Sequence, residues 1–193
     1  MSTITLGDLK HTTREELAKR LLSSSSSNPQ TTSTSTSTTS SSTSQENSTP
    51  TSNPDLENLA IIDVRDSDHI GGHILGSRWV PSSSLDAKIP ELVRELQDKE
   101  TVVFHCALSQ QRGPSAALRY LRERERLING SEGEAVREGG DTDEGEKEVE
   151  GRKGRKKQEV VVLDGGFVKW QEVYGEDERL TEGWRKDVWE FGY

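Results

Sequence analysis

The stretch TVVFHCALSQQRGPS, which spans residues 101–115, decides the fold of this 193-residue chain. Its first five residues form an apolar run that is typical of a strand buried on both faces. Gly113-Pro114-Ser115 is typical of a helix start, because proline is favoured in the first turn. Between strand and helix lie Cys106, the only cysteine of the chain, and Arg112. A strand that runs through a short loop into a helix predicts an α/β domain.

Short apolar strands and amphipathic helices alternate on both sides of this stretch. The chain is therefore predicted to form a mostly parallel central sheet flanked by helices. Strands are predicted at residues 59–64, 78–80 and 160–163, with a short extended piece at residues 4–6. Helices are predicted after a capping box from Thr13 to Glu16, at residues 85–96, from residue 113, and from Gly165-Gly166-Phe167. A last helix is predicted to place Leu180, Trp184, Val188 and Phe191 on one face.

Two stretches of biased composition interrupt this pattern. Residues 23–54, rich in Ser and Thr, contain no hydrophobic residue, and residues 129–157, rich in glycine and charge, contain three. Such segments bury too little apolar surface to offset the entropy of ordering them, so both are predicted to be disordered insertions. Only 29% of the chain is hydrophobic, but the residues outside these stretches have the apolar content of one domain. We therefore expect residues 1–193 to form a single domain.

The composition also argues against several classes of protein. A single cysteine cannot form an intramolecular disulfide, and the apolar runs are too short to span a membrane. The net charge of −9 disfavours nucleic-acid binding, and the four histidines lack metal-ligand spacing, so we expect no nucleic-acid partner and no metal. The N-terminus lacks the features of a signal peptide. We expect a monomer without a resident cofactor, in the cytoplasm or in the nucleus, since the basic run at residues 152–157 resembles an import signal.

The loop that follows the central strand has the features of an anion site. A loop that leads into a helix N-terminus points backbone N–H groups inward, and the helix dipole adds positive potential. In such a ring Cys106 is expected to act as a thiolate nucleophile, and Arg112 to grip two oxygens of an oxyanion. The backbone groups expected to bind the oxyanion belong to Ala107, Leu108, Ser109, Gln110, Gln111 and Gly113. A buried structural cysteine is the alternative, but the unbroken order of strand, cysteine, loop, arginine and helix favours the reactive role.

Outside the two biased stretches, the chain resembles a rhodanese-fold domain. Ile62-Asp63-Val64-Arg65 is similar to an early strand-end signature of that family. The second and third similar motifs are Gly72-His73-Ile74 with Gly76-Ser77 and Pro81, and Leu163-Asp164-Gly165-Gly166-Phe167 with Trp170. These motifs indicate the fold more than the activity. We interpret Asp63 and Arg65 as a structural ion pair and His73 as a hydrogen-bonded turn residue.

The length of the loop bears on the activity. Rhodanese-type sulfurtransferases have a loop one residue shorter. The pattern His-Cys-x5-Arg, present here from His105 to Arg112, resembles the cell-division-cycle dual-specificity phosphatases and the eukaryotic arsenate reductases. An extra residue widens the ring of amides from one sulfur atom to a phosphate-sized or arsenate-sized anion. The resemblance implies a cysteine-dependent phosphatase that acts on a phosphoprotein or a small phosphoester through a phosphocysteine.

Three further activities stay open. Arsenate reduction would use the same two residues, and its cysteine–arsenic adduct would need glutathione or glutaredoxin because the chain has no second cysteine. Sulfur transfer through a persulfide on Cys106 is disfavoured by the loop length, and an inactive phosphate-binding or interaction module is the last possibility. Residues 107–111 include no carboxylate, so the sequence identifies no proton donor. The side chain of His105 is expected to point to the opposite face of the sheet from Cys106, because neighbours along a strand alternate.

Overall fold

The computed structural model describes residues 4–25, 58–133 and 158–191. The first elements are a short 3₁₀ helix, η1 (Leu6–Asp8), strand β1 (Lys10–Thr12) and helix α1 (Arg14–Ser25). The central elements are β2 (Leu59–Asp63), β3 (His73–Ile74), β4 (Arg78–Trp79), α3 (Leu85–Glu95), β5 (Thr101–His105) and α4 (Arg112–Gly133). The last elements are β6 (Glu159–Leu163), α5 (Gly166–Tyr174), β7 (Thr181–Glu182) and α6 (Lys186–Phe191).

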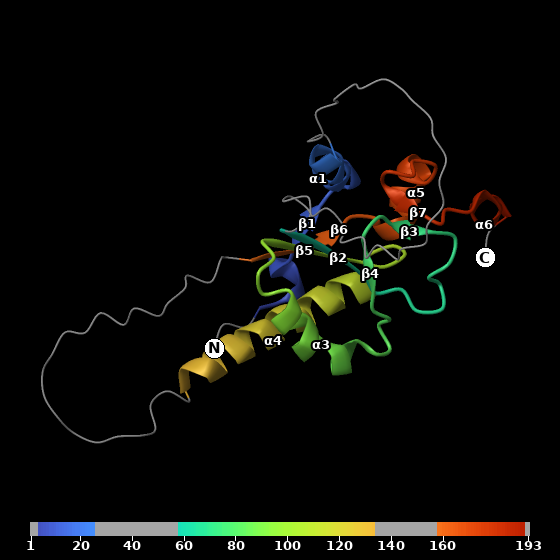
Figure 1. The fold of residues 1–193 in the computed structure, drawn as a ribbon. Coiled ribbons are helices and arrows are strands. Elements are labelled where there is room, and N and C mark those ends of the chain that lie inside the picture. Colours follow the sequence, from blue (N-terminus) through green and yellow to red (C-terminus); the bar gives the residue numbers. More distant parts are fainter. Residues whose placement is uncertain (1–3, 26–57, 134–157, 192–193) are drawn as a thin grey trace, which may run out of the picture.

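A five-stranded sheet forms the centre of the domain, in the order β1-β6-β5-β2-β4 (Figure 1). All four pairs of neighbouring strands are parallel, as predicted for an α/β domain. In the register of β2 and β5, Asp63 lies opposite His105. Strands β3 and β7 form a separate antiparallel pair. The carboxyl ends of β2 and β5 are therefore neighbours, and the loops that follow them meet at one edge of the sheet.

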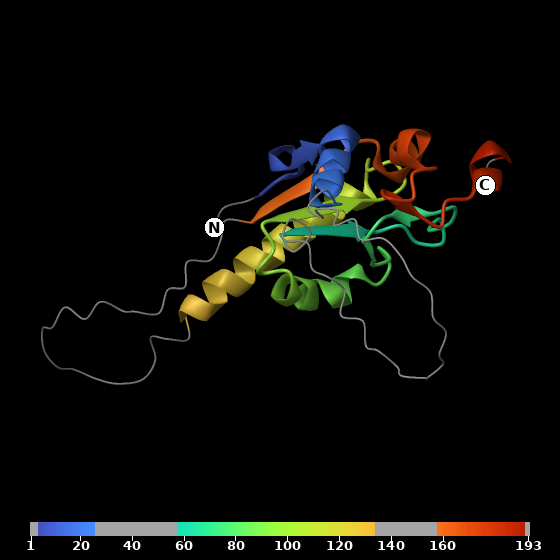
Figure 2. The ribbon, with the colours of Figure 1, turned by 45° about the horizontal axis from the view of Figure 1, so that its top comes forward.

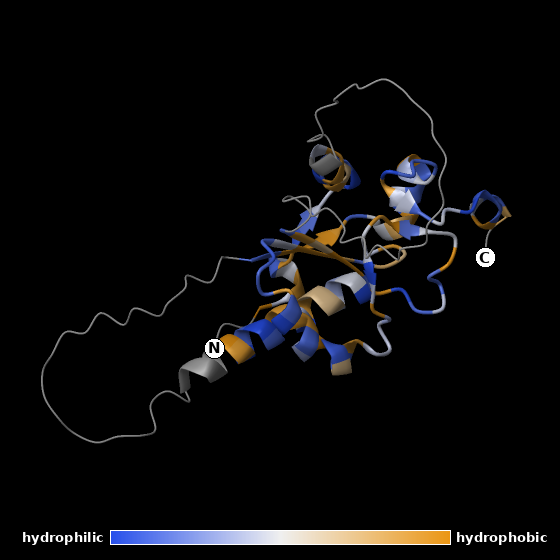
Figure 3. Cartoon of the chain, viewed as in Figure 1, coloured by the Kyte–Doolittle hydropathy of each residue, from blue (hydrophilic) through white to orange (hydrophobic). Residues whose placement is uncertain are grey.

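Helices cover both faces of the sheet. In two views, α3 and α4 lie on one face, and α1 and α5 lie on the other (Figures 1 and 2). One buried cluster packs α3 and α4 against the sheet and includes Phe104, Cys106 and Tyr120. The other packs α1 and α5 and includes Phe167 and Trp170. The hydrophobic colouring is concentrated on the central strands between these helices (Figure 3).

The sequence explains the main elements. All five residues of β5 are buried, because a strand in the middle of a parallel sheet has helices on both faces. In α3 the buried side chains recur at helical spacing, as predicted: they belong to Leu85, Ile89, Leu92 and Val93. The predicted capping box is confirmed, since the Glu16 N–H donates to Thr13 Oγ1 at 3.2 Å and the Thr13 N–H donates to Glu16 Oε2 at 3.0 Å.

Two predictions about the ends of the chain are wrong. The last helix is shorter than expected: Thr181 pairs with Ile74 in the β3–β7 ladder, and Gly183 has a positive φ that interrupts helical geometry. Leu180 is buried before this ladder, whereas Phe191 is 84% exposed in α6, so the two do not share one helix face. At the N-terminus the extended segment is β1, which pairs with β6, rather than residues 4–6.

The predicted insertions overlap the described residues only at their first few positions. Helix α1 continues to Ser25 and α4 continues to Gly133, beyond the predicted starts at residues 23 and 129. The rest of both predictions, residues 26–54 and 134–157, lies outside the described residues. Within the described ranges, no helix is both long and apolar enough to cross a membrane.

Candidate functional site

The predicted loop lies at the carboxyl edge of the sheet, between β5 and α4. Cys106 follows the last residue of β5 and is 4% exposed, while Arg112 is the first residue of α4. The Val64 N–H donates to the His105 carbonyl at 2.9 Å, which extends the pairing of β2 and β5 up to the start of the loop. The predicted unit of strand, loop and helix is therefore present, with Cys106 at the start of the loop and Arg112 at its end.

Ser109 turns the loop back toward Cys106. Its φ of 53° lies in the left-handed region, which residues other than glycine rarely adopt. In this conformation the Ser109 N–H donates to Cys106 Sγ at 3.2 Å, and Ser109 Oγ accepts from the Cys106 N–H at 3.4 Å. The hydrogen bond to sulfur places a donor where negative charge on a thiolate is stabilised.

The other predicted amide donors lie in the loop and in the first turn of α4. Among the described residues, no acceptor takes a hydrogen bond from the N–H groups of Ala107, Leu108, Gln110, Gln111 and Gly113. Backbone donors normally find a partner in the protein or in water, and a helix N-terminus favours an anionic one. Of the six predicted amide donors, the structure therefore shows one, the Ser109 N–H, directed at the Cys106 sulfur.

The start of α5 supports the other side of the loop. The Phe167 N–H donates to the Cys106 carbonyl and the Val168 N–H to the Ala107 carbonyl, each at 2.9 Å. Gly166 makes this approach possible, because a Cβ atom on it would lie 2.4 Å from the Cys106 oxygen and 2.5 Å from the Ala107 oxygen. The third family-like motif of the sequence therefore contacts the loop directly.

Two aspartates that the sequence patterns did not single out hold Arg112. Asp68 accepts from Nη1 at 2.7 Å and from Nη2 at 2.5 Å, and Asp66 accepts from Nη1 at 3.2 Å. The hydrogen bonds to Asp68 are the main reason that the pKa of Arg112 is raised, and the same bonds lower the pKa of Asp68. The position of these aspartates in the sequence could have indicated them. Both follow β2, the neighbour of β5 in the sheet, and ligand sites form where the carboxyl ends of neighbouring strands meet.

Asp66 is itself held by the segment that precedes α3. Its carboxylate accepts from Ser82 Oγ at 2.5 Å and from the Ser83 N–H at 3.0 Å. The hydrogen bond from Ser82 is the largest cause of a lowered pKa of about 2 for Asp66. The Asp66 N–H in turn donates to Asp68 Oδ1 at 2.9 Å. Both carboxylates are therefore ionised at neutral pH and fixed in place.

Behind the loop lies a buried polar cluster on the α1 and α5 face. Arg65 and Asp63 form the predicted ion pair at 2.6 Å with both side chains fully buried, and the Arg65 guanidinium lies 4.2 Å from the Phe167 ring centre. The His105 side chain contacts this cluster and not the Cys106 side of the sheet, which confirms its predicted direction. Burial lowers the pKa of His105 and favours its neutral form.

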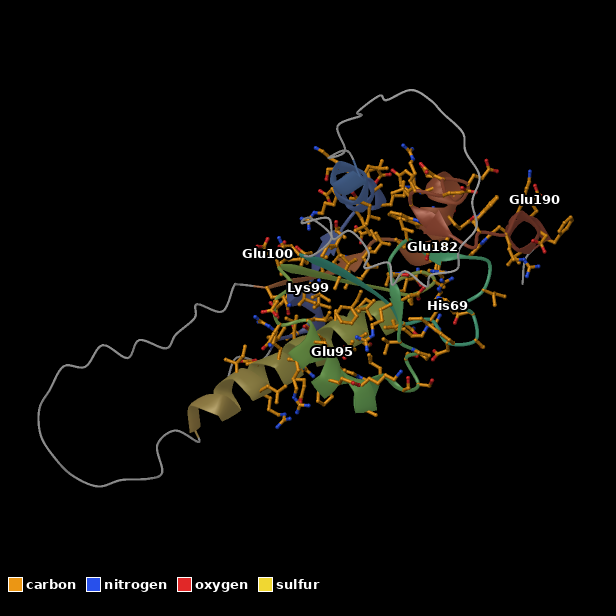
Figure 4. The ribbon with its side chains drawn as sticks, in the orientation of Figure 1. His69, Glu95, Lys99, Glu100, Glu182 and Glu190 are labelled. Carbon is orange, nitrogen blue, oxygen red and sulfur yellow. The ribbon has the colours of Figure 1, made fainter. Side chains whose placement is uncertain are left out.

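The histidines nearest the surface at this edge have structural contacts. His69 stacks on Trp79 with ring centres 4.7 Å apart. His73 forms the predicted hydrogen bond, since its Nε2 lies 2.9 Å from Glu182, but it is not a turn residue: it belongs to β3 and lies opposite Glu182 in the pairing of β3 with β7. His69 and Glu182 lie at one end of the domain, and Lys99 and Glu100 lie at the other (Figure 4). Within the described part of the chain, no cluster of three or more His, Cys, Asp or Glu side chains could hold a metal ion.

Residues 51–173 match the family of rhodanese-like domains, and the chain belongs to this family. It is similar to the CDC25-like phosphatase YCH1 of Saccharomyces cerevisiae, with 36% identity over 144 residues that cover 69% of this chain and 79% of the relative. It is also 50% identical over 64 residues to arsenate reductase 2.2 of rice, Oryza sativa subsp. japonica. That match covers 33% of this chain and 49% of the relative, so the chain spans about half of the plant protein.

A solved structure of the yeast protein Ygr203w, described as a protein tyrosine phosphatase of the rhodanese family, has the same architecture. The comparison gives a TM-score of 0.55 and 29% identity, and it covers 96% of this chain and 99% of that one. The relatives and the solved structure therefore include phosphatases of the rhodanese-like family, and the relatives also include an arsenate reductase.

Proposed function

We propose that this chain is a cysteine-dependent phosphatase with Cys106 as nucleophile. The observation that carries the proposal is the loop from Cys106 to Arg112. In it the Ser109 N–H donates to the cysteine sulfur, and the N–H groups of residues 107, 108, 110 and 111 have no acceptor among the described residues. A ring of donors around a sulfur atom stabilises both a thiolate and the oxygens of a phosphoryl group. The relative YCH1, named a phosphatase, supports the same activity.

The chemistry needs two steps. In the first, the Cys106 thiolate attacks phosphorus in line, the S–P bond forms, and the ester P–O bond breaks with its electron pair on the leaving oxygen. In the second, water attacks phosphorus, the S–P bond breaks, and inorganic phosphate leaves with the thiolate restored. Loop amides and Arg112 stabilise the charge on the equatorial oxygens in both steps. No metal and no cofactor enters these two steps.

The carboxylates beside the loop affect which esters react well. Asp66 and Asp68 are both ionised and both hold Arg112, so neither offers a proton to the leaving oxygen in this arrangement. Without such a proton the rate depends strongly on the stability of the departing oxyanion. We therefore expect phosphorylated substrates with a phenolic leaving group, such as phosphotyrosine or aryl phosphates, to react faster than alkyl phosphates.

Arsenate reduction is the second candidate, and the similarity to a rice arsenate reductase favours it over sulfur transfer and over an inactive binding module. Cys106 would displace water from arsenate and form a cysteine–arsenic(V) adduct. The chain has one cysteine, so two external thiols, from glutathione or glutaredoxin, would supply the two electrons that reduce arsenic to the +3 state and would end as a disulfide. The bond between Cys106 and arsenic then breaks, arsenite leaves, and the Cys106 thiol is restored. The same loop serves both reactions.

The decisive experiment compares the purified chain with its Cys106→Ser variant in three assays. These use an aryl phosphate, arsenate with glutathione and glutaredoxin, and thiosulfate with cyanide. We expect turnover of the aryl phosphate that is abolished in the variant, and a phosphorus label that remains on the wild-type protein after acid quenching. Activity with thiosulfate alone would contradict both the phosphatase and the loop-length argument. A folded chain inactive in all assays would instead indicate a binding module.

A further inference from the structure

The hydrogen bonds of Arg112 use one side of its guanidinium and leave the other side open. A guanidinium carries five N–H groups in a planar fork. Asp68 accepts one from each terminal nitrogen, and Asp66 accepts the second one on Nη1. The two that remain, on Nε and on Nη2, are parallel and point to the same side. No described residue accepts a hydrogen bond from Nε.

An open fork of this kind matches the geometry of a tetrahedral oxyanion. Two parallel N–H groups bind two oxygens of phosphate at once, which a single ammonium cannot do. The benefit depends on orientation, because an arginine side chain has many rotamers and ordering them costs free energy on binding. A carboxylate bound to the other N–H groups of the guanidinium orders the side chain in the unliganded protein, so this free energy is not lost when the oxyanion binds.

The two aspartates are anchored well enough to set that orientation. Asp68 is fixed by the Asp66 N–H, and Asp66 is fixed by Ser82 and Ser83 in the segment before α3. The Arg112 side chain is one third exposed, so solvent alone would leave it mobile. The loop after β2 thus holds the guanidinium at the start of α4, and the segment before α3 holds that loop in place.

We propose that Asp68 is a positioning residue for Arg112, supported by Asp66, and that it presents the Nε–Nη2 fork of Arg112 to the oxyanion. This inference rests on the proposed function, since it specifies how one residue of that site is oriented. A negative charge beside Arg112 does not help an anion to bind in the ground state. Orientation matters most in the transition state, where charge spreads over the oxygens that the fork contacts.

The test is Asp68→Asn, which keeps the shape of the side chain and removes its charge. We expect kcat to fall about tenfold or more, while the inhibition constant of inorganic phosphate changes by less than about threefold or tightens. Asp86→Asn is the matched control, because Asp86 also pairs with an arginine, Arg119 at 2.7 Å, but on the exposed face of α3 and α4. This control is expected to leave kcat and phosphate inhibition unchanged. Equal losses in phosphate binding and kcat would overturn the proposal.

Two further measurements separate positioning from other roles of Asp68. A proton donor would matter more for alkyl than for aryl phosphates, whereas a positioning residue lowers kcat by the same factor for both. In an Arg112→Lys background, Asp68→Asn should cost less than about twofold, since lysine has no fork to orient. A larger loss for alkyl phosphates, or a full tenfold loss in the lysine background, would contradict the proposal.

The orientation of Arg112 can also be measured without turnover. In nitrogen NMR spectra the Arg112 Nε–H signal, assigned by its absence in Arg112→Lys, should shift when inorganic phosphate is added and should broaden in Asp68→Asn. If the chain has no phosphatase activity but its Nε–H signal shifts with phosphate and broadens in Asp68→Asn, the proposed function is contradicted and this inference is not. If the enzyme is active but the Nε–H signal does not shift when phosphate is added, the inference is overturned while the proposed function stands.

Discussion

Gly166 lies so close to Cys106 that a Cβ atom on it would come within 2.4 Å of the Cys106 carbonyl oxygen. The residue also has a φ of 59°, in the region that glycine adopts without steric cost. Its two successors donate their N–H groups to the Cys106 and Ala107 carbonyls. The start of α5 therefore sets the position of the nucleophile's backbone, and only glycine fits at the contact.

Gly166→Ala should displace the loop and reduce activity strongly. The methyl group would overlap two carbonyl oxygens of the backbone, which cannot rotate away as a side chain would. A shift of about 1 Å at a reacting group can cost about 100-fold in rate. We expect a loss of that order in kcat/KM for an aryl phosphate, together with a lower melting temperature.

Gly76→Ala is the matched control for this prediction. Gly76 also has a positive φ, of 70°, but nothing lies within 4 Å of a Cβ atom built on it. It should share the backbone strain of about 1–2 kcal/mol without the overlap, and so lose stability but keep its activity. Equal activity of the Gly166 and Gly76 variants would show that the contact of α5 with the loop does not position Cys106.

Replacing Ser109 separates backbone conformation from hydrogen bonding. Both Ser109→Ala and Ser109→Gly lose the Oγ that accepts from the Cys106 N–H, but only glycine adopts a φ of 53° without strain. We expect the alanine variant to be less stable than the glycine variant by about 1 kcal/mol, measured by urea unfolding. The reverse order would mean that the left-handed conformation of Ser109 costs little in this loop.

The carboxyl of Asp66 should make the stability of the fold depend on pH in the acid range. Its pKa is lowered from 3.8 to about 2, chiefly by Ser82. A lowered carboxyl pKa stabilises the fold above the ordinary value and loses that contribution as the pH falls toward the folded value. Asp66→Asn should therefore be less stable than wild type at pH 7.

The stability difference between wild type and Asp66→Asn should shrink as the pH falls from about 4 to about 2. Urea midpoints of both proteins, measured in steps over this interval, test it. A difference that stays constant down to pH 2 would show that the ionised carboxyl of Asp66 contributes nothing to stability.

His105→Asn should affect stability more than catalysis. The His105 ring is buried near Asp63, Arg65 and His69 on the face opposite the Cys106 side chain, and its burial lowers its pKa below the ordinary 6.5. We expect kcat to change by less than about tenfold, because the ring has no direct part in the reaction. A loss comparable to that of Cys106→Ser would contradict the structural role.

The same variant should change the pH dependence of stability. A histidine held neutral in the fold stabilises it above the unfolded pKa, and this contribution is lost as the pH falls below 6.5. Wild type should therefore lose stability relative to His105→Asn between about pH 7.5 and pH 5.5. Melting temperatures of both proteins over that range provide the measurement. Parallel curves would mean that the ring is as easily protonated in the fold as in the unfolded chain.

Sequence patterns predict the parts of this protein that depend on neighbours along the chain. The apolar run of β5, the proline in the first turn of α4 and the capping box at Thr13 each act within a few residues, and all three are confirmed. The chain order of cysteine and arginine also determined their places at the two ends of the loop. Local patterns of this kind are reliable because each one is satisfied by the residues that form it.

Features that join distant segments were missed. Strand β7 has two residues, too few for an alternating pattern, and it forms because Thr181 meets Ile74 across the antiparallel pair. The ion pair of Asp68 with Arg112 joins residues 44 positions apart, and it exists only because β2 and β5 are neighbours in the sheet. The order of the strands in the sheet was not predicted from the sequence. Asp66 and Asp68, which follow β2, could therefore not be placed beside the Cys106 loop.

The direction of the strands has a consequence for engineering this protein. Asn58 and Gln158 lie at the entry to β2 and β6, and the Asn58 carbonyl binds the N–H groups of Glu100 and Thr101 at the amino edge of the sheet. The end of the molecule with Lys99 and Glu100 is opposite the end with His69 (Figure 4). The chain thus enters β2 at Asn58 and β6 at Gln158 a full strand length from Cys106. We expect a reporter domain joined to the chain at either entry to leave the Cys106 loop accessible.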